Sequence, residues 1–147
     1  MDEVSLRPIG DTSEMRDLAA ALAASGLPHD DLSEPGRQFY SIRRADRQLG
    51  FIGVEGNGRD RLLRSFVIPP EHRAAGVGSR ALAVLENRVR EDNAKRLHLL
   101  TTTAAKFFRR HGYQPASRDE APDTIARSRE FTTLCPASAE YLVKDLL

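Results

Sequence analysis

Two patterns of hydrophobic and polar residues follow one another along the chain, and the change falls near Ile68. Up to that point, apolar and polar residues mostly alternate in short runs, which is the two-residue period of a half-buried strand. One stretch instead has apolar residues three and four positions apart, which predicts a helix over 13–24. Gly56-Asn57-Gly58 predicts a tight turn in the second of two hairpins. The predicted strands cover residues 4–9, 38–44, 48–55 and 62–68.

After Ile68, helices and strands take turns. Leu82, Leu85 and Val89 fall on one face of a long helix predicted over 78–93. The remaining predicted elements are a strand at 96–100, a short helix at 103–111, a strand at 113–116, a polar connection over 117–136 and a last strand at 141–144. This order predicts an α/β (α+β) fold with a mixed, mostly antiparallel sheet of about seven strands and helices on both faces. A length of 147 residues suits a single domain, 1–147.

Composition narrows the classes of function. The chain has 22 basic and 21 acidic residues and a net charge of +1, which gives no electrostatic case for binding nucleic acid or a membrane surface. A single cysteine allows neither an intramolecular disulfide nor a cysteine metal cluster, so we expect no metal. There is no long apolar run, and the first residues are acidic where a secretory signal would be basic, so we expect a cytoplasmic protein.

The strongest chemical motif is the loop between the strand 62–68 and the long helix. The helix begins within Arg73-Ala74-Ala75-Gly76-Val77-Gly78, followed by Ser79. A helix N-terminus offers free backbone N–H groups and a partial positive charge, and glycines let an anion approach closely. Together with the Arg73 cation, this predicts a pyrophosphate site. The loop lacks the Gly-Lys-Ser/Thr of a Walker P-loop and the third glycine of a dinucleotide fingerprint, and the alternative is a helix start with incidental glycines.

The same residues resemble the signature of the GCN5-related N-acetyltransferase (GNAT) superfamily, Arg/Gln-x-x-Gly-x-Gly/Ala, and the resemblance extends over most of the chain. It implies a GNAT-like fold and acetyl-CoA as cosubstrate. It also implies that a splayed strand lies beside the pantetheine arm, and that one of its N–H groups holds the acetyl carbonyl. The residues that the resemblance assigns to the cofactor are Phe66, Val67, Ile68, Arg73, Ala74, Ala75, Gly76, Val77, Gly78 and Ser79.

Further segments resemble two groups of acetyltransferases more closely. They are similar to small N-acetyltransferases encoded with arsenic-resistance genes and to the acetyltransferase domain of N-acetylglutamate synthases, and both resemblances are less specific than the loop signature. Both resemblances imply an amino-acid-like acceptor, glutamate-like or an arsenic or phosphorus analogue, and the first implies a role in arsenic resistance. The segments are Leu63-Arg64-Ser65, 100–104, Phe107-Phe108, Gly112-Tyr113, Arg129-Glu130-Phe131 and 134–139.

Acetyl transfer to an amine needs a group that takes a proton from the ammonium and one that protonates the leaving thiolate. Glu55, at the end of a predicted strand, is the candidate base, with an ordinary solvated carboxylate as the alternative. Many GNAT members carry a tyrosine where this chain has Phe108, and phenylalanine has no proton to donate. The acid is therefore unassigned, with the hydroxyls of Thr101, Thr102 and Thr103 and ordered water as candidates.

Two arginines are candidates for gripping an acceptor carboxylate. Period-two alternation places Leu62, Arg64 and Phe66 on one face, and an arginine between apolar neighbours suits a carboxylate contact. Arg129 is available from the polar connection. The expected partner is a small-molecule amine, and the last strand suggests a homodimer. A protein N-terminal or lysine acetyltransferase and a non-catalytic CoA-binding regulatory module remain alternatives.

Overall fold

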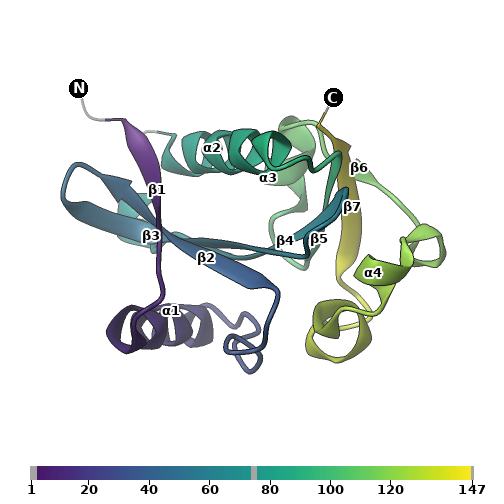
Figure 1. Ribbon diagram of the computed structural model, residues 1–147, viewed down its shortest axis with the longest axis horizontal. Helices are drawn as coiled ribbons and strands as arrows, with labels where there is room; N and C mark the ends of the chain where they lie inside the picture. The colour runs from purple at the N-terminus through teal and green to yellow at the C-terminus, as the bar shows by residue number, and fades with distance from the viewer. Residues whose placement is uncertain (1–2, 74–75, 147) are drawn as a thin grey trace.

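The computed structural model describes residues 3–73 and 76–146, which form one seven-stranded sheet (Figure 1). The strand order is β1-β2-β3-β4-β5-β7-β6, and β4–β5 is the parallel pair while the other neighbours are antiparallel. The predicted mixed, mostly antiparallel sheet is therefore confirmed. The strands are β1 (Val4–Pro8), β2 (Arg37–Arg44), β3 (Arg47–Glu55), β4 (Asp60–Val67), β5 (Arg96–Thr101), β6 (Gln114–Pro115) and β7 (Glu140–Asp145).

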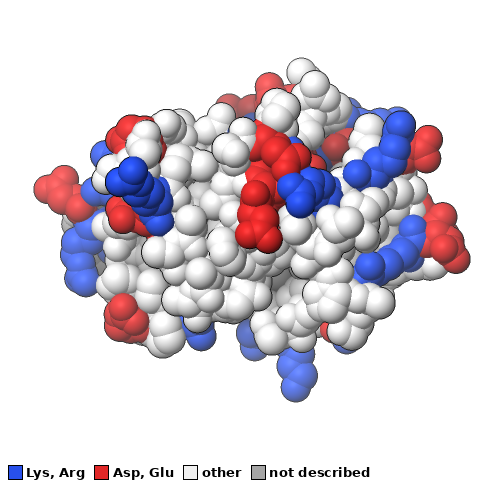
Figure 2. Space-filling view, turned by 90° about the horizontal axis from the view of Figure 1, so that it is seen from below, with Lys and Arg blue, Asp and Glu red and all other residues white. Residues whose placement is uncertain are grey.

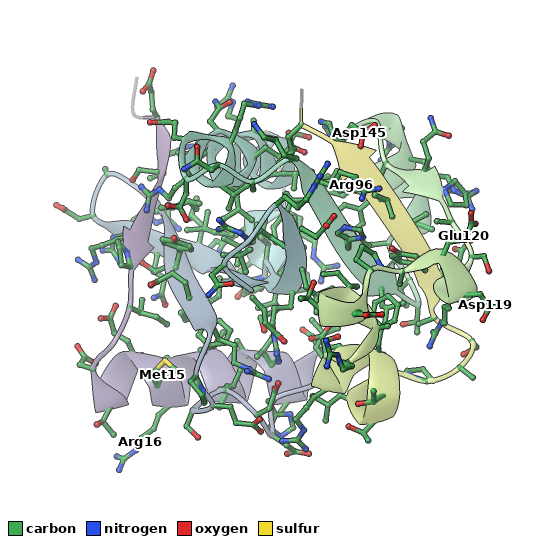
Figure 3. All side chains as sticks on the ribbon, turned by 45° about the vertical axis from the view of Figure 1, so that its right-hand side comes forward. Met15, Arg16, Arg96, Asp119, Glu120 and Asp145 are labelled. Atoms are coloured by element: carbon green, nitrogen blue, oxygen red, sulfur yellow. The ribbon has the colours of Figure 1, made fainter. Side chains whose placement is uncertain are left out.

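Helices cover both faces of this sheet, as the sequence predicts. In Figure 1, α2 and α3 lie above the sheet and α1 and α4 below it. On α1, Met15 packs against the core while Arg16 points to solvent (Figure 3). None of the described helices is long and apolar enough to cross a membrane. The helices are α1 (Thr12–Ala24), α2 (Val77–Glu91), α3 (Ala105–Arg110) and α4 (Asp123–Ala126), with 3-10 turns at Pro70–His72 and Arg118–Glu120 and a π-helix at Glu130–Leu134.

Each face of the sheet has its own hydrophobic core. On the α2 side, Leu82, Leu85 and Val89 are at most 3% exposed, which confirms the helical spacing predicted for them. On the α1 side, Leu18 and Leu22 are fully buried in a smaller cluster. The sheet is thus held from both sides, and its side chains must alternate correctly between the two cores.

The end of the chain departs from expectation. β7 lies between β5 and β6, and β6 pairs with its Leu142 and Val143. The edge strand β6 is only two residues long, and Pro115 is one of them. The connection after it, predicted as polar loop, contains the short helix α4 and the π-helix Glu130–Leu134.

A β-bulge in β4 breaks the alternation expected for this strand. Ser65 has a left-handed φ of 56°, and three steps along β4 face two steps along β3, because Val67 pairs with Phe51 and Arg64 with Gly53. Pairing of β4 with β5 ends at Leu62, which is opposite His98. Beyond this point the two parallel strands diverge.

The bulge also changes which side chains share a face. Arg64 lies over the Phe39 ring on the α1 side, whereas Phe66 packs against the α2-side core. The prediction that Leu62, Arg64 and Phe66 share one face is therefore wrong, because the extra residue shifts the two-residue period by one step.

The positive φ of Ser65 makes a testable prediction. Glycine adopts this conformation freely, whereas a β-branched residue is strained there. We expect Ser65→Val to unfold with a free energy about 2 kcal/mol or more below that of Ser65→Gly in urea denaturation. The same two substitutions at Ser5, an exposed residue of β1, are the control, and there valine should be the more stable. Equal stabilities at position 65 would contradict the strained bulge.

Candidate active site

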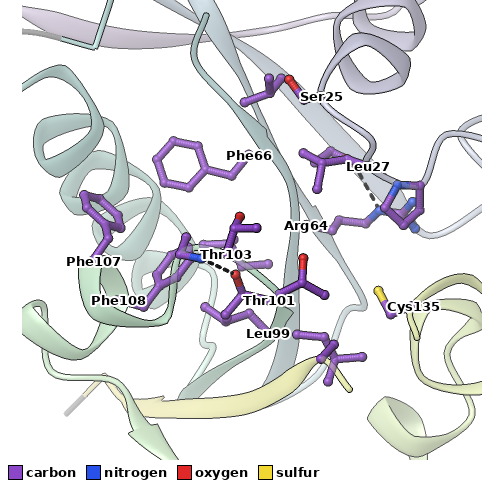
Figure 4. Close-up of a pocket in the computed structure, with 18 of the residues that line it drawn as sticks. Ser25, Leu27, Arg64, Phe66, Leu99, Thr101, Thr103, Phe107, Phe108 and Cys135 are labelled. Carbon is purple, nitrogen blue, oxygen red and sulfur yellow. Dashed lines mark hydrogen bonds between the residues drawn. The ribbon is translucent and has the colours of Figure 1, made fainter. Parts of the chain in front are cut away.

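A cleft of about 1060 Å³ opens where β4 and β5 diverge (Figure 4). In this view, the aromatic rings of Phe66, Phe107 and Phe108 lie on one side, and Arg64 and Cys135 lie on the other. The walls are formed by residues 63–68, 99–104 and 25–30, by parts of α2 and α3, and by Glu130, Leu134, Cys135, Pro136 and Ala139.

One end of the cleft lies against the N-terminus of α2. Gly76 caps this helix with a φ of 71°, and a Cβ on it would meet nothing within 4 Å, so the backbone there faces open space. Gly78 and Ser79 line the cleft as well, and the Ser79 hydroxyl lies 3.0 Å from Nε2 of His111. Val77 is different, because its side chain is buried in the α2-side core. The helix α2 is 15 residues long, and its open N-terminus fits a bound pyrophosphate.

The predicted residues Ala74 and Ala75 lie outside the described residues. Arg73 lines the cleft, and its Nε donates to the carbonyl of Ile68 at 2.7 Å, which fixes the guanidinium near the helix start. Lys106 and Arg110 add two more cations from α3. The sequence reasoning missed this pair, although a spacing of four residues places both on one helix face.

The middle of the cleft is apolar. Phe66, Val67 and Ile68 line it as expected for the pantetheine wall, and the ring centres of Phe66 and Phe108 are 6.1 Å apart. Phe108 is 5% exposed and packs in the core. No tyrosine is among the described residues that line the cleft. Thr101 does line it, and its hydroxyl accepts the N–H of Ala104 at 3.0 Å.

Arg64 is held by protein carboxylates and does not offer its guanidinium to an acceptor. Nη1 and Nη2 donate to the two oxygens of Asp31 at 2.6 and 2.5 Å, and Nη1 also donates to Glu55 at 2.9 Å. Arg37 binds Asp31 from another side at 2.7 Å. The side chains of Arg64 and Asp31 are fully buried. This geometry does not support the prediction that Arg64 grips an acceptor carboxylate, because Asp31 already occupies its paired donors.

Arg129 and Glu55 are also placed away from the expected contacts. The Arg129 side chain is 42% exposed, pairs with Glu34 and does not line the cleft. One oxygen of Glu55 accepts from Arg64 and the other lies 3.8 Å from Arg37, and Glu55 does not line the cleft either. Neither residue is therefore placed as these predictions expect, because Glu55 pairs with arginines and Arg129 pairs with a glutamate of the same chain.

A different carboxylate, Glu130, faces the cleft. It is 4% exposed, its Oε2 lies 3.3 Å from Nε of Arg64, and its Oε1 accepts the thiol of Cys135 at 3.8 Å. Burial raises the pKa of Glu130 to about 7, although Arg64 acts in the opposite direction. Burial also raises the pKa of the Cys135 thiol, to about 12, so this cysteine stays protonated. Sequence reasoning missed Glu130 because it lies in a polar connection without a periodic pattern.

Comparison with known proteins gives the family. Residues 35–115 match the family model described as acetyltransferase (GNAT) domain, and the chain belongs to this family, whose acetyl donor is acetyl-CoA. The sequence resemblance to GNAT enzymes is thereby confirmed.

Relatives and solved structures agree with this membership. An amino-acid acetyltransferase of Pseudomonas syringae pv. tomato is 38% identical over 69 residues, which is 47% of this chain and 16% of that relative. N-acetylglutamate synthase from Neisseria gonorrhoeae, complexed with coenzyme A and L-arginine, superposes with a TM-score of 0.77 at 21% identity over 99% of this chain and 34% of that one. Tetrahymena GCN5 superposes with a TM-score of 0.78 at 11% identity over 97% and 96%. These structural likenesses show a shared fold.

The helix start makes the first prediction for the site. Gly76→Val places a branched side chain where the backbone faces the cleft, so we expect CoA binding to fall by at least about tenfold in calorimetry. Gly36→Val is the matched control, because Gly36 has a similar φ of 84° and open space around it but does not line the cleft. Unchanged CoA affinity in a folded Gly76→Val protein would contradict the assignment.

Asp31 makes a prediction about stability. Burial by itself raises its pKa, but the hydrogen bonds from Arg64 and Arg37 outweigh this and lower the pKa to about 2. A carboxylate with a lowered folded pKa stabilises the protein above its unfolded pKa, and the contribution is lost as pH falls toward 2.

We therefore expect Asp31→Asn to lower the free energy of unfolding at pH 7 by about 2–3 kcal/mol, and the difference from the native protein to shrink below about pH 4. Urea denaturation at several pH values measures this, with the exposed Asp17→Asn of α1 as control. A difference that is independent of pH would show that the Asp31 charge is not what stabilises the fold.

Proposed function

We propose that this chain is an acetyl-CoA-dependent N-acetyltransferase that acts on the amino group of a small, amino-acid-like molecule. The observation that carries the proposal is the cleft between β4 and β5, which joins a cationic helix start to a buried polar end. These two ends suit the phosphates of a CoA thioester and a polar acceptor, with the apolar stretch between them.

Different residues along this cleft would bind different parts of acetyl-CoA. The N–H groups at the start of α2, with Arg73, would bind the pyrophosphate. Phe66, Val67 and Ile68 would pack along the pantetheine arm. When bound, acetyl-CoA supplies the acetyl group, and the backbone freed by the bulge at Ser65 would hold its carbonyl oxygen next to the acceptor.

Three observations support a small acceptor. The connection from Ser117 to Pro136 supplies Glu130, Leu134, Cys135 and Pro136 to the cleft wall, so it bounds the space at the acceptor end. The relatives in Pseudomonas are amino-acid acetyltransferases. A structure of the Neisseria gonorrhoeae synthase holds coenzyme A and N-acetyl-glutamate. The sequence resemblance adds arsenic- or phosphorus-containing amino acids as candidates, with a role in arsenic resistance.

A panel of acceptors tests this proposal. We expect thiol release from acetyl-CoA to be stimulated at least tenfold more by one or more α-amino acids than by their decarboxylated amines. The panel should contain glutamate, phosphorus and arsenic analogues, and matching amines. Peptides with free N-termini or lysines form the other arm, and faster acetylation of a peptide would favour a protein acetyltransferase instead. Tight CoA binding without turnover on any acceptor would favour a regulatory module.

A further inference from the structure

Three carboxylates lie at the acceptor end of the cleft, and they differ in whether they line it. Asp31, Glu55 and Glu130 all lie around the buried Arg64. Asp31 and Glu55 do not line the cleft, whereas Glu130 does. A base must reach the acceptor, so only Glu130 of these three is placed to touch it.

Charge balance in this cluster explains how Glu130 can accept a proton. Two guanidinium groups, Arg37 and Arg64, face two carboxylates, Asp31 and Glu55, so these four charges sum to zero. Glu130 adds a third carboxylate to these two guanidinium groups, so this cluster of described residues carries one negative charge in excess. A buried carboxylate in a cluster with excess negative charge takes up a proton more readily than Asp31, which has both Arg64 and Arg37 as close partners.

The π-helix holds Glu130 in place. Its backbone bond runs from the N–H of Cys135 to the carbonyl of Glu130 at 3.0 Å, and the Cys135 thiol donates to the Glu130 carboxylate at 3.8 Å. The two residues therefore fix each other through main chain and side chain, and both line the cleft. Single π-turns are rare and are frequent at functional sites.

We infer that Glu130 is the catalytic base that takes a proton from the ammonium group of the acceptor. This inference rests on the proposed function and deepens it. Glu130 would take one proton, which frees the nitrogen lone pair to form the C–N bond while the C–S bond breaks and its electron pair leaves with sulfur. The second nitrogen-bound proton neutralises the thiolate, and Glu130 returns its proton to solvent, so one proton is released overall.

The assignment predicts the dependence of rate on pH. Glu130 must be ionised to act, so kcat/KM should rise with pH through about 7, the pKa to which burial raises this group. The charged groups that face it are Arg64 from β4, Glu55 from β3 and Asp31 from the loop after α1, with the Cys135 thiol on its own segment. Arg64 lowers the pKa of Glu130 and both carboxylates raise it. The acidic limb, the part of the profile where kcat/KM rises with pH, therefore depends on the charges of the whole cluster.

Four variants test the inference with the best acceptor of the panel. We expect Glu130→Gln to lower kcat/KM by about 100-fold and to lose the acidic limb, with CoA affinity unchanged. Glu130→Asp should recover part of the rate and the limb. Glu34→Gln is the control, since Glu34 pairs with Arg129 and does not line the cleft. Loss of the limb in Glu55→Gln, with the limb kept in Glu130→Gln, would overturn the inference.

Two measurements separate this inference from folding defects and from the proposed function. Carboxyl-carbon NMR should show a group that titrates near pH 7 in the native protein and is missing in Glu130→Gln, and this needs no acceptor. Because folding disfavours the ionised form, its stability contribution is lost as pH rises through 7, so Glu130→Gln should melt no lower than native at pH 8. If the native enzyme acetylates no amine, the proposed function fails; if it does and Glu130→Gln keeps rate and limb, only the assignment of Glu130 fails.

Discussion

The site depends on one constraint in the sheet: β4 and β5 run parallel but pair only up to Leu62 and His98. Antiparallel neighbours hold each strand on its other side, β3 beside β4 and β7 beside β5, so the two can separate without unravelling the sheet. The extra residue at Ser65 adds a local twist where they part. A space is thereby built from main chain at the centre of the sheet, lined by strand backbone on both sides.

A second feature fixes the acceptor end of this space. The buried Arg64 forms ion pairs with three carboxylates, which come from β3, from the loop after α1 and from the π-helix. Breaking a buried ion pair of this kind typically costs about 3–5 kcal/mol, since one charge is left without a partner. The same arginine therefore ties together segments that are distant in sequence. On the face seen from the α1 side, acidic and basic groups lie near one another, and wide uncharged areas separate these groups (Figure 2).

The sequence predicted the fold and the open helix start at one end of the cleft, but not the arrangement of charges at the other end. The helix start near Gly76 could be found because its chemistry lies in consecutive residues, and the order of helices and strands along the chain follows from local periodicity. Arg64 was recognised as unusual, yet its partner Asp31 is 33 residues away, and no local pattern links the two. The bulge at Ser65 could not be predicted either, because serine carries no mark of a left-handed backbone. Glu130 depends on a π-turn that brings it back over the cleft, and it was noticed only as part of a family resemblance.

The two outer strands have a further consequence, for the behaviour of the protein at high concentration. The β6 edge is two residues long and includes Pro115, which has no N–H to offer to an incoming strand. The opposite edge, β1, ends in Pro8 and carries Arg7 beside it. Short, proline-bearing and charged borders discourage strand addition by another chain. The sheet can therefore leave backbone unpaired between β4 and β5, while both of its edge strands discourage pairing with another chain.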